Sequence, residues 1–150
     1  MVPSATLTIR TGTPNDLPSL MAIDAFAQSH SERVEFLRQS LALGQCVVAA
    51  SEVELAGFAI LNHSFFGFGF IALVVVASAH RRQGNGLRLL EALERRCTSS
   101  KLFSSANLSN VAARRLFVRA GFVESGRVEN LDPGDSEVIY FKAPNVAHER

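Results

Sequence analysis

Residues 70–87 read FIALVVVASAHRRQGNGL, an apolar run followed by two arginines and two glycines. The apolar run is too short to cross a membrane, and its β-branched residues predict a buried strand. The segment from Asn85 or Gly86 to Cys97 predicts a helix, because its leucines and Cys97 recur on one face. Residues 80–86 are therefore expected to connect a strand to a helix.

This glycine-rich turn has the composition of an anion site. Backbone amides at the start of a helix lie at the positive end of its dipole, and glycines such as Gly84 and Gly86 let a phosphate oxygen approach. Arg81 and Arg82 can add charge-assisted contacts. A P-loop is excluded because no Gly-Lys-Ser/Thr follows, and a dinucleotide fingerprint is excluded because Leu89 stands where Gly or Ala is required. A plain turn with two solvated arginines remains the alternative.

Length and composition favour one globular domain over residues 1–150, because 150 residues with 47% hydrophobic content can bury a core. A net charge of +1 gives no electrostatic reason to expect nucleic acid or an anionic membrane as a partner. Residues 1–10 lack the features of a signal peptide, so a cytoplasmic protein is expected. Cys46 and Cys97 are not spaced as metal ligands, so we expect buried reduced thiols and no metal.

Hydrophobic periodicity predicts an α+β fold with a mixed, mostly antiparallel sheet. Strands are expected over 6–12, 45–51, 55–64, 71–77, 101–106, 122–131 and 137–142. Helices are expected over 13–28, 31–43, 85–97 and 110–120. Ser109 is the expected N-cap of the fourth helix, and Gly44 and Gly121 are expected to end the second and fourth.

Two motifs agree with this order of elements. Residues 81–86 match a six-residue pattern: an Arg or Gln, any two residues, a Gly, any one residue, and finally a Gly or Ala. A second motif is matched downstream at Asn110, Ala113, Leu116, Phe117, Gly121 and Phe122. Together they resemble the GCN5-related N-acetyltransferase (GNAT) superfamily over nearly the whole chain. The resemblance implies a sheet of about seven strands, splayed between the fourth and fifth and flanked by about four helices.

The resemblance also implies an acetyl-CoA site. Its pyrophosphate is expected on the turn, at Arg81, Arg82, Gln83, Gly84, Asn85, Gly86 and Leu87. Its pantetheine arm is expected along the main chain of Val74, Val75 and Val76, with the thioester entering between the fourth and fifth strands. Further cofactor contacts are expected at Asn110, Ala113 and Phe117.

Acetyl transfer to an amine needs a neutral nitrogen and a polarised carbonyl oxygen, and the departing thiolate benefits from a proton. The resemblance assigns the oxyanion to a main-chain amide near Val76. It assigns the thiolate proton to a tyrosine where this chain has Phe117, and the only tyrosine, Tyr140, does not match the motif. Either water or a hydroxyl such as Ser109 protonates the sulfur, or the thiolate leaves unassisted.

The two motifs do not assign the general base or the residues that bind the acceptor. No Asp or Glu lies between Leu55 and Gly86, so the predicted fourth strand carries no carboxylate base. His63 can serve through water because histidine is the side chain whose ordinary pKa lies near neutrality, or it is a partly exposed strand residue. Glu129 and Asp132 either attract a cationic amine or belong to a solvated turn. The aromatic run FFGFGF, residues 65–70, either lines an acceptor pocket or packs.

The sequence therefore predicts an acetyl-CoA-dependent N-acetyltransferase that acts on the primary amine of a small molecule by direct attack on the thioester. A protein N-terminus or lysine is the alternative acceptor, and the resemblance allows a homodimer. A second hypothesis is a non-catalytic acyl-CoA-binding or sensing domain, favoured by Phe117 and the missing strand carboxylate. An unrelated α+β protein with a plain turn is the third.

Overall fold

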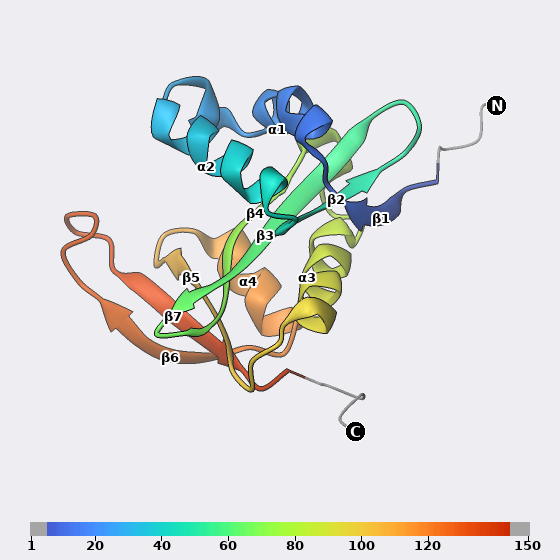
Figure 1. The fold of residues 1–150 in the computed structure, drawn as a ribbon. Helices are drawn as coiled ribbons and strands as arrows, with labels where there is room; N and C mark the ends of the chain where they lie inside the picture. The colour runs from blue at the N-terminus through green and yellow to red at the C-terminus, as the bar shows by residue number, and fades with distance from the viewer. Residues whose placement is uncertain (1–5, 145–150) are drawn as a thin grey trace. The chain divides into compact units, whose positions relative to one another are not determined.

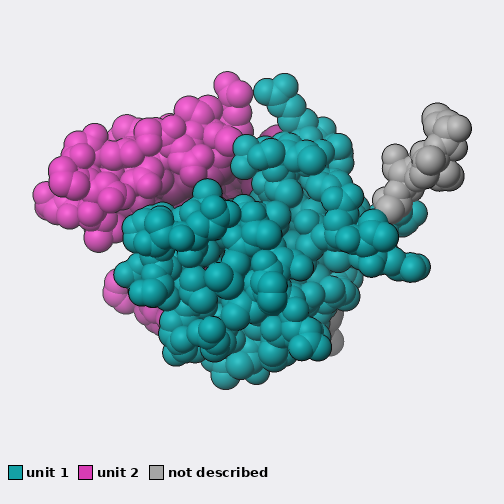
Figure 2. Space-filling view, turned by 90° about the horizontal axis from the view of Figure 1, so that it is seen from above, with its two compact units in different colours: residues 1–60, 73–92 teal, residues 61–72, 93–150 magenta. Residues whose placement is uncertain are grey.

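The computed structural model describes residues 6–144, which form two compact units (Figure 2). Among these residues, unit 1 comprises 6–60 and 73–92, and unit 2 comprises 61–72 and 93–144. The expectation that residues 1–150 make one domain stays a prediction.

A mixed sheet of seven strands has the order β1-β2-β3-β4-β5-β7-β6 (Figure 1). Its strands are β1 Thr8–Thr11, β2 Cys46–Ala50, β3 Leu55–Phe65, β4 Phe68–Val76, β5 Leu102–Asn107, β6 Val123–Val128 and β7 Glu137–Lys142. The β4–β5 pair is parallel, and the pairs β1–β2, β2–β3, β5–β7 and β6–β7 are antiparallel. The predicted α+β class and mixed sheet are confirmed.

The α-helices are α1 Leu17–Ile23, α2 Ser31–Ala42, α3 Asn85–Arg96 and α4 Val111–Arg119. The single helix expected over 13–28 is wrong, because it divides into two short 3-10 helices with α1 between them. The break falls at Asp24, which is extended and 4% exposed. Its carboxylate accepts hydrogen bonds from Arg33 of α2 at 2.8 and 3.1 Å. A buried carboxylate needs a partner of opposite charge, and the helix ends at Asp24, where the carboxylate binds Arg33.

The core of unit 1 is built around β2, which is buried along its whole length. Leu20 of α1 and Leu37 of α2 are fully buried in the same unit. At Gly57 of β3, a Cβ would lie 2.8 Å from the Val75 carbonyl oxygen and 3.2 Å from a methyl carbon of Leu89. Glycine therefore lets β4 and the first turns of α3 approach β3 closely, and this packing fixes where α3 begins.

The core of unit 2 lies between α4 and one face of β5 and β7. The Phe117 ring of α4 lies 5.2 Å from the Tyr140 ring and 5.6 Å from the Phe122 ring. Burial alternates along β5, because only one of its faces meets this core. Cys46 and Cys97, in units 1 and 2, are both buried and free, as expected.

The parallel pairing of β4 with β5 is short. It joins Gly69 to Leu102, Phe70 to Phe103 and Ile71 to Ser104. Both strands continue, β4 to Val76 and β5 to Asn107, without further pairing to each other among the described residues. The splay expected between the fourth and fifth strands stays a prediction.

The FFGFGF run is a tight hairpin that joins β3 to β4, so β4 begins three residues before the expected position 71. Phe66 and Gly67 have φ angles of +54° and +83°. Positive φ at both central residues is typical of the turn that connects two antiparallel strands directly. The hairpin brings the phenylalanines of both strands together on unit 2.

Candidate functional site

The turn between β4 and α3, in unit 1, contains two left-handed backbone positions. After a short 3-10 helix at Ser78–His80, Arg82 has φ +62° and Gly84 has φ +83°. A Cβ placed at Gly84 would meet no heavy atom within 4 Å, so the backbone there faces open space. A left-handed arginine is strained and persists only where its surroundings hold it. Such backbone turns successive N–H groups to one side and makes a concavity for an anion.

Side chains of the turn itself hold this conformation. Arg81 Nε donates to the last carbonyl of β4 at 3.1 Å. Asn85 is 3% exposed, and its Nδ2 donates to the carbonyl oxygen of His80 at 3.0 Å. The His80 ring contacts the carboxylate of Glu54 at 3.1 Å. In contrast, the exposed Arg82 has no hydrogen bond or ion pair with any residue from 6 to 144, so its guanidinium can meet an anion.

The remaining positions assigned to the donor in unit 1 lie within this turn or next to it. Gln83 is exposed, and Gly86 and Leu87 are half-buried at the start of α3. The half-buried stretch Val74, Val75 and Val76 lies beyond the last residue of β4 that pairs with β5. This arrangement is compatible with a ligand that pairs with main-chain groups.

The N-terminus of α4, in unit 2, differs from the expectation. Asn110 is its N-cap, and Oδ1 of Asn110 accepts a hydrogen bond from the Ala113 amide at 3.2 Å. The expected cap Ser109 is therefore wrong. The Ser109 hydroxyl instead donates to Asp135 at 2.6 Å, and its amide donates to the other oxygen of that carboxylate at 3.1 Å. A catalytic role for Ser109 stays a prediction.

Phe117 is 2% exposed and packs in the core of unit 2. Its neighbours there are aromatic rings, and its side chain has no proton to give. The half-buried Ala113 lies one turn earlier on α4. Contacts of Asn110, Ala113 and Phe117 with the donor stay predictions.

His63, on β3 in unit 2, is exposed and interacts with Thr98, two residues after the end of α3. Its Nε2 accepts a hydrogen bond from the Thr98 amide at 3.2 Å and lies 3.1 Å from the Thr98 hydroxyl. A general base needs a free lone pair, and this contact occupies the one on Nε2. The proposed role of His63 as a base stays a prediction, and the contact weighs against it.

The loop between β6 and β7 carries carboxylates that are held by uncharged donors. Glu129 accepts from the Ser136 hydroxyl at 2.7 Å, and Asp132 accepts from the Asn107 amide at 2.9 Å. Glu137, at the start of β7, accepts from the Ser105 hydroxyl at 2.7 Å. These three and Asp135 form no ion pair with any described residue. Their charge is not neutralised, and the acceptor-side role of Glu129 and Asp132 stays a prediction.

Comparison of the sequence with protein families gives one match. The sequence model of the Acetyltransferase (GNAT) family aligns with residues 16–122, a span that includes both motifs. The chain belongs to the GNAT acetyltransferase family. It is accordingly an acetyltransferase whose donor is acetyl-CoA.

Solved structures agree with this assignment. A GNAT-family acetyltransferase from Bacillus cereus ATCC 10987 is 31% identical, with 92% of this chain and 97% of that chain covered and a TM-score of 0.85. Diaminobutyrate acetyltransferase from Paenibacillus lautus, in complex with its substrate and coenzyme A, is 21% identical (94% and 96% covered, TM-score 0.75). The ribosomal-protein-S18-alanine N-acetyltransferase from Escherichia coli is 23% identical (97% and 98% covered, TM-score 0.77). The last two share the GNAT fold. No curated protein matches the sequence.

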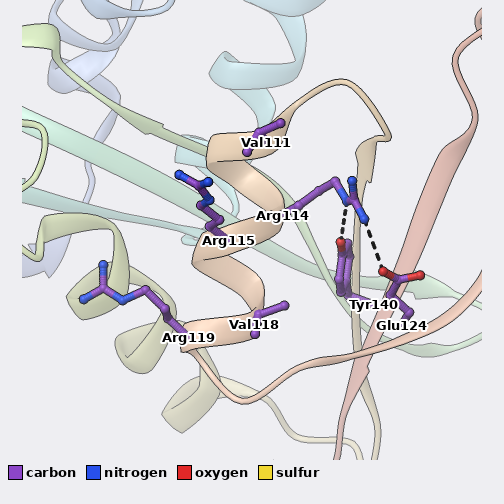
Figure 3. Close-up of a pocket in the computed structure, with 7 residues that line it drawn as sticks. All are labelled: Val111, Arg114, Arg115, Val118, Arg119, Glu124 and Tyr140. Carbon is purple, nitrogen blue, oxygen red and sulfur yellow. Dashed lines mark hydrogen bonds and ion pairs between the residues drawn. The ribbon is translucent and has the colours of Figure 1, made fainter.

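One feature of this GNAT chain has no counterpart in the sequence analysis: a cavity of about 520 Å³ on the surface of α4 in unit 2. It is lined by Val111, Arg114, Arg115, Val118, Arg119, Glu124 and Tyr140 (Figure 3). Arg114 donates to the Tyr140 hydroxyl at 3.0 Å and to Glu124 at 3.3 Å. The hydrogen bond to Tyr140 raises the pKa of Arg114. Arg115 and Arg119 point away from Tyr140 (Figure 3).

Among residues 6–144, no three His, Cys, Asp or Glu side chains gather as a metal site. No helix in the same range has the length and apolar character needed to traverse a bilayer. The absence of a metal, of nucleic-acid and membrane partners, the cytoplasmic location and the homodimer all stay predictions.

Proposed function

We propose that this GNAT chain transfers the acetyl group of acetyl-CoA to the primary amine of a small molecule by direct attack. The amine nitrogen bonds to the thioester carbon, the carbon–sulfur bond breaks, the thiolate leaves and the nitrogen loses one proton to water. Membership of the GNAT family identifies acetyl-CoA as the donor. Proteins of the same fold are named for a small amino compound and for a ribosomal protein, so the fold alone does not choose the acceptor.

The left-handed turn at Arg82 and Gly84 is the observation that carries the proposal. A pyrophosphate needs several N–H donors at once and room for its oxygens. The turn offers amides at the N-terminus of α3, open space at Gly84 and an exposed guanidinium at Arg82. These groups fit the pyrophosphate of acetyl-CoA.

The side chains considered for the thiolate proton are poorly suited to give it. Phe117 has no donor, the Tyr140 hydroxyl accepts from Arg114, and the Ser109 hydroxyl donates to a carboxylate. A thiol has an ordinary pKa of about 8.5, so its thiolate is a fair leaving group near neutral pH. We therefore take the thiolate to leave unassisted.

Isothermal titration with acetyl-CoA tests the site at the turn. Gly84→Ala places a methyl group where the pyrophosphate is proposed, and we expect acetyl-CoA affinity to fall about tenfold or more. Gly44→Ala is the matched control, because Gly44 also has a positive φ, +70°, and open space around it. Acetyl-pantetheine, which lacks the pyrophosphate, should bind the parent and Gly84→Ala alike. Unchanged acetyl-CoA affinity in a folded Gly84→Ala protein would contradict the assignment.

Release of free thiol tests the transfer itself. An acetyltransferase releases coenzyme A faster when an amine is added, and the amine appears acetylated by mass spectrometry. The non-catalytic binding domain predicts that acetyl-CoA binds and that no amine accelerates thiol release. This hypothesis keeps one supporting observation, the buried Phe117 in place of a tyrosine.

A further inference from the structure

Unit 2 carries a half-buried aromatic surface on one side of its strands. We call it the aromatic face, and it consists of Phe65, Phe68, Phe70, Phe103 and Phe141. The ring of Phe103 lies 4.7 Å from that of Phe65 and 5.4 Å from that of Phe141. Strand register aligns them, because Phe70 pairs with Phe103 and Phe103 pairs with Phe141. Each ring is packed on its neighbours and still partly accessible.

Both helical segments of unit 2 lie on the opposite side of these strands. Tyr140, the neighbour of Phe141, contacts Phe117 of α4. Gly69, the neighbour of Phe70, faces Cys97, directly after α3. Because side chains alternate along a strand, the aromatic face projects away from both helical segments. Among the described residues of unit 2, no helix covers it, and an accessible apolar face of this kind indicates a binding surface.

The same side of the sheet becomes acidic toward the end of β5. Phe103, Ser105 and Asn107 follow one another on this side, because they are two residues apart. The Ser105 hydroxyl binds Glu137 at 2.7 Å, and the Asn107 amide binds Asp132 at 2.9 Å. Ser105 lies two residues from Phe103, roughly 7 Å along the strand, and Asn107 lies four residues away, roughly 13 Å. The nearer carboxylate, Glu137, is therefore separated from the aromatic rings by about the length of a short aliphatic chain.

We propose that the acceptor is a primary amine that carries an aromatic ring and no carboxylate. This inference rests on the proposed acetyl transfer and names its acceptor class. The ring packs on Phe103 and its neighbours, and the ammonium group points along β5 toward Glu137. The ammonium group loses a proton to water before its nitrogen attacks the thioester. The resemblance implies a thioester that enters between the fourth and fifth strands. The nitrogen of the acceptor, rather than its ring, lies at the part of β5 that continues past its pairing with β4.

The carboxylates and the aromatic rings of this surface disfavour acceptors that carry a carboxylate and acceptors that lack an aromatic ring. The carboxylates of the β6–β7 loop attract a cation, and they repel an acceptor that carries its own carboxylate, such as an amino acid. An aromatic ring gains more on the aromatic face than an alkyl group, because ring pairs add to the burial of area. The Phe68 ring already accepts a cation, since Lys101 Nζ lies 5.2 Å from its centroid.

Three acceptors separate these contributions: 2-phenylethylamine, n-butylamine and phenylalanine. With acetyl-CoA saturating, we expect kcat/KM for 2-phenylethylamine to exceed that for n-butylamine by about tenfold or more. Phenylalanine should be poorer than both amines. Equal values for the three acceptors, or a preference for a peptide N-terminus, overturn the aromatic-amine proposal and leave acetyl transfer intact. No thiol release with any amine overturns acetyl transfer itself.

Variants locate the site on the protein. Phe103→Leu keeps an apolar side chain but removes the ring, so KM for 2-phenylethylamine should rise about fivefold while KM for n-butylamine stays unchanged. Glu137→Gln should raise KM for both amines and narrow the discrimination against phenylalanine. Phe66→Leu is the control, because Phe66 is 86% exposed at the hairpin tip. Unchanged acetyl-CoA affinity in each variant shows that the fold is kept. A lower kcat with unchanged KM in Phe103→Leu would overturn the assignment.

Discussion

The glycine-rich turn of unit 1 and the aromatic face of unit 2 are built from different parts of the chain. The turn presents main chain at Arg82 and Gly84, while Arg81 and Asn85 hold its shape. The aromatic face presents side chains on regular strands. A main-chain site needs only a few glycines at fixed spacing, so a motif can reveal it. A side-chain site can change residue by residue within one fold, so the acceptor must be inferred from each structure separately.

The largest expected effect tests whether the core of unit 1 positions the turn. In Gly57→Ala the new Cβ lies 2.8 Å from a carbonyl oxygen that cannot move easily. Overpacking of this kind costs about 1–3 kcal/mol of unfolding free energy, which chemical denaturation measures. Because the displaced atoms belong to β4 and α3, acetyl-CoA affinity should fall as well. A destabilised variant with parental affinity would show that the turn does not depend on this packing.

Arg82→Ala separates the side-chain part of the turn from its main chain. The exposed guanidinium should contribute one charge-assisted contact to a phosphate, so acetyl-CoA affinity should fall about tenfold by titration calorimetry. Arg82→Lys should recover part of this loss, and high salt should reduce it. Arg38→Ala, an exposed arginine on α2, is the control. If Arg82→Ala binds like the parent, the main chain alone holds the anion.

Asp16→Asn provides a smaller effect outside both sites. Hydrogen bonds from Arg10 lower the pKa of Asp16, and the Thr13 amide also donates to it. A carboxyl with a lowered folded-state pKa stabilises the protein above its unfolded pKa, and the effect is lost as the pH falls below about 4. We expect Asp16→Asn to lose about 1 kcal/mol or less at pH 7, because Arg10 is half-exposed, and a smaller amount at pH 2. An equal loss at both pH values would contradict the ion pair as the cause.

The smallest expected effect concerns Phe117. Phe117→Tyr restores the hydroxyl that the GNAT motif usually carries, in a position that is buried among rings. If the thiolate leaves unassisted, kcat should change less than about twofold, and acetyl-CoA affinity should stay the same. A large rise in kcat would show instead that proton donation limits the parent enzyme. A steady-state assay with a saturating amine measures this directly.

Much of the fold could be predicted from the sequence, because local patterns determine it. Strand alternation, helical spacing and the glycines gave the element order and the position of the turn. The features that the sequence does not predict depend on contacts between residues that are far apart in the chain. The helix expected over 13–28 breaks at Asp24 because Arg33, on the next helix, binds its carboxylate. No periodicity within 13–28 contains that information.

Side-chain choices at the site show the same limit. Ser109 and Asn110 are both good helix caps, and the structure selects Asn110 because Asp135 takes the Ser109 hydroxyl. Arg114 donates a hydrogen bond to Tyr140, which lies 26 positions later in the sequence, so no local motif predicts the pair. The sequence leaves the aromatic run as a pocket lining or as packing, and it does not predict the hairpin, because Phe66 is an unusual residue at positive φ.

The burial of Tyr140 has an optical consequence. The chain contains one tyrosine and no tryptophan, so its tyrosine fluorescence arises from a single ring. That ring is fully buried in unit 2, between β7 and α4, with its hydroxyl bound to Arg114. Its emission therefore reports the loosening of this one contact. The protein carries its own spectroscopic label, and the opening of one unit can be followed in the unmodified chain.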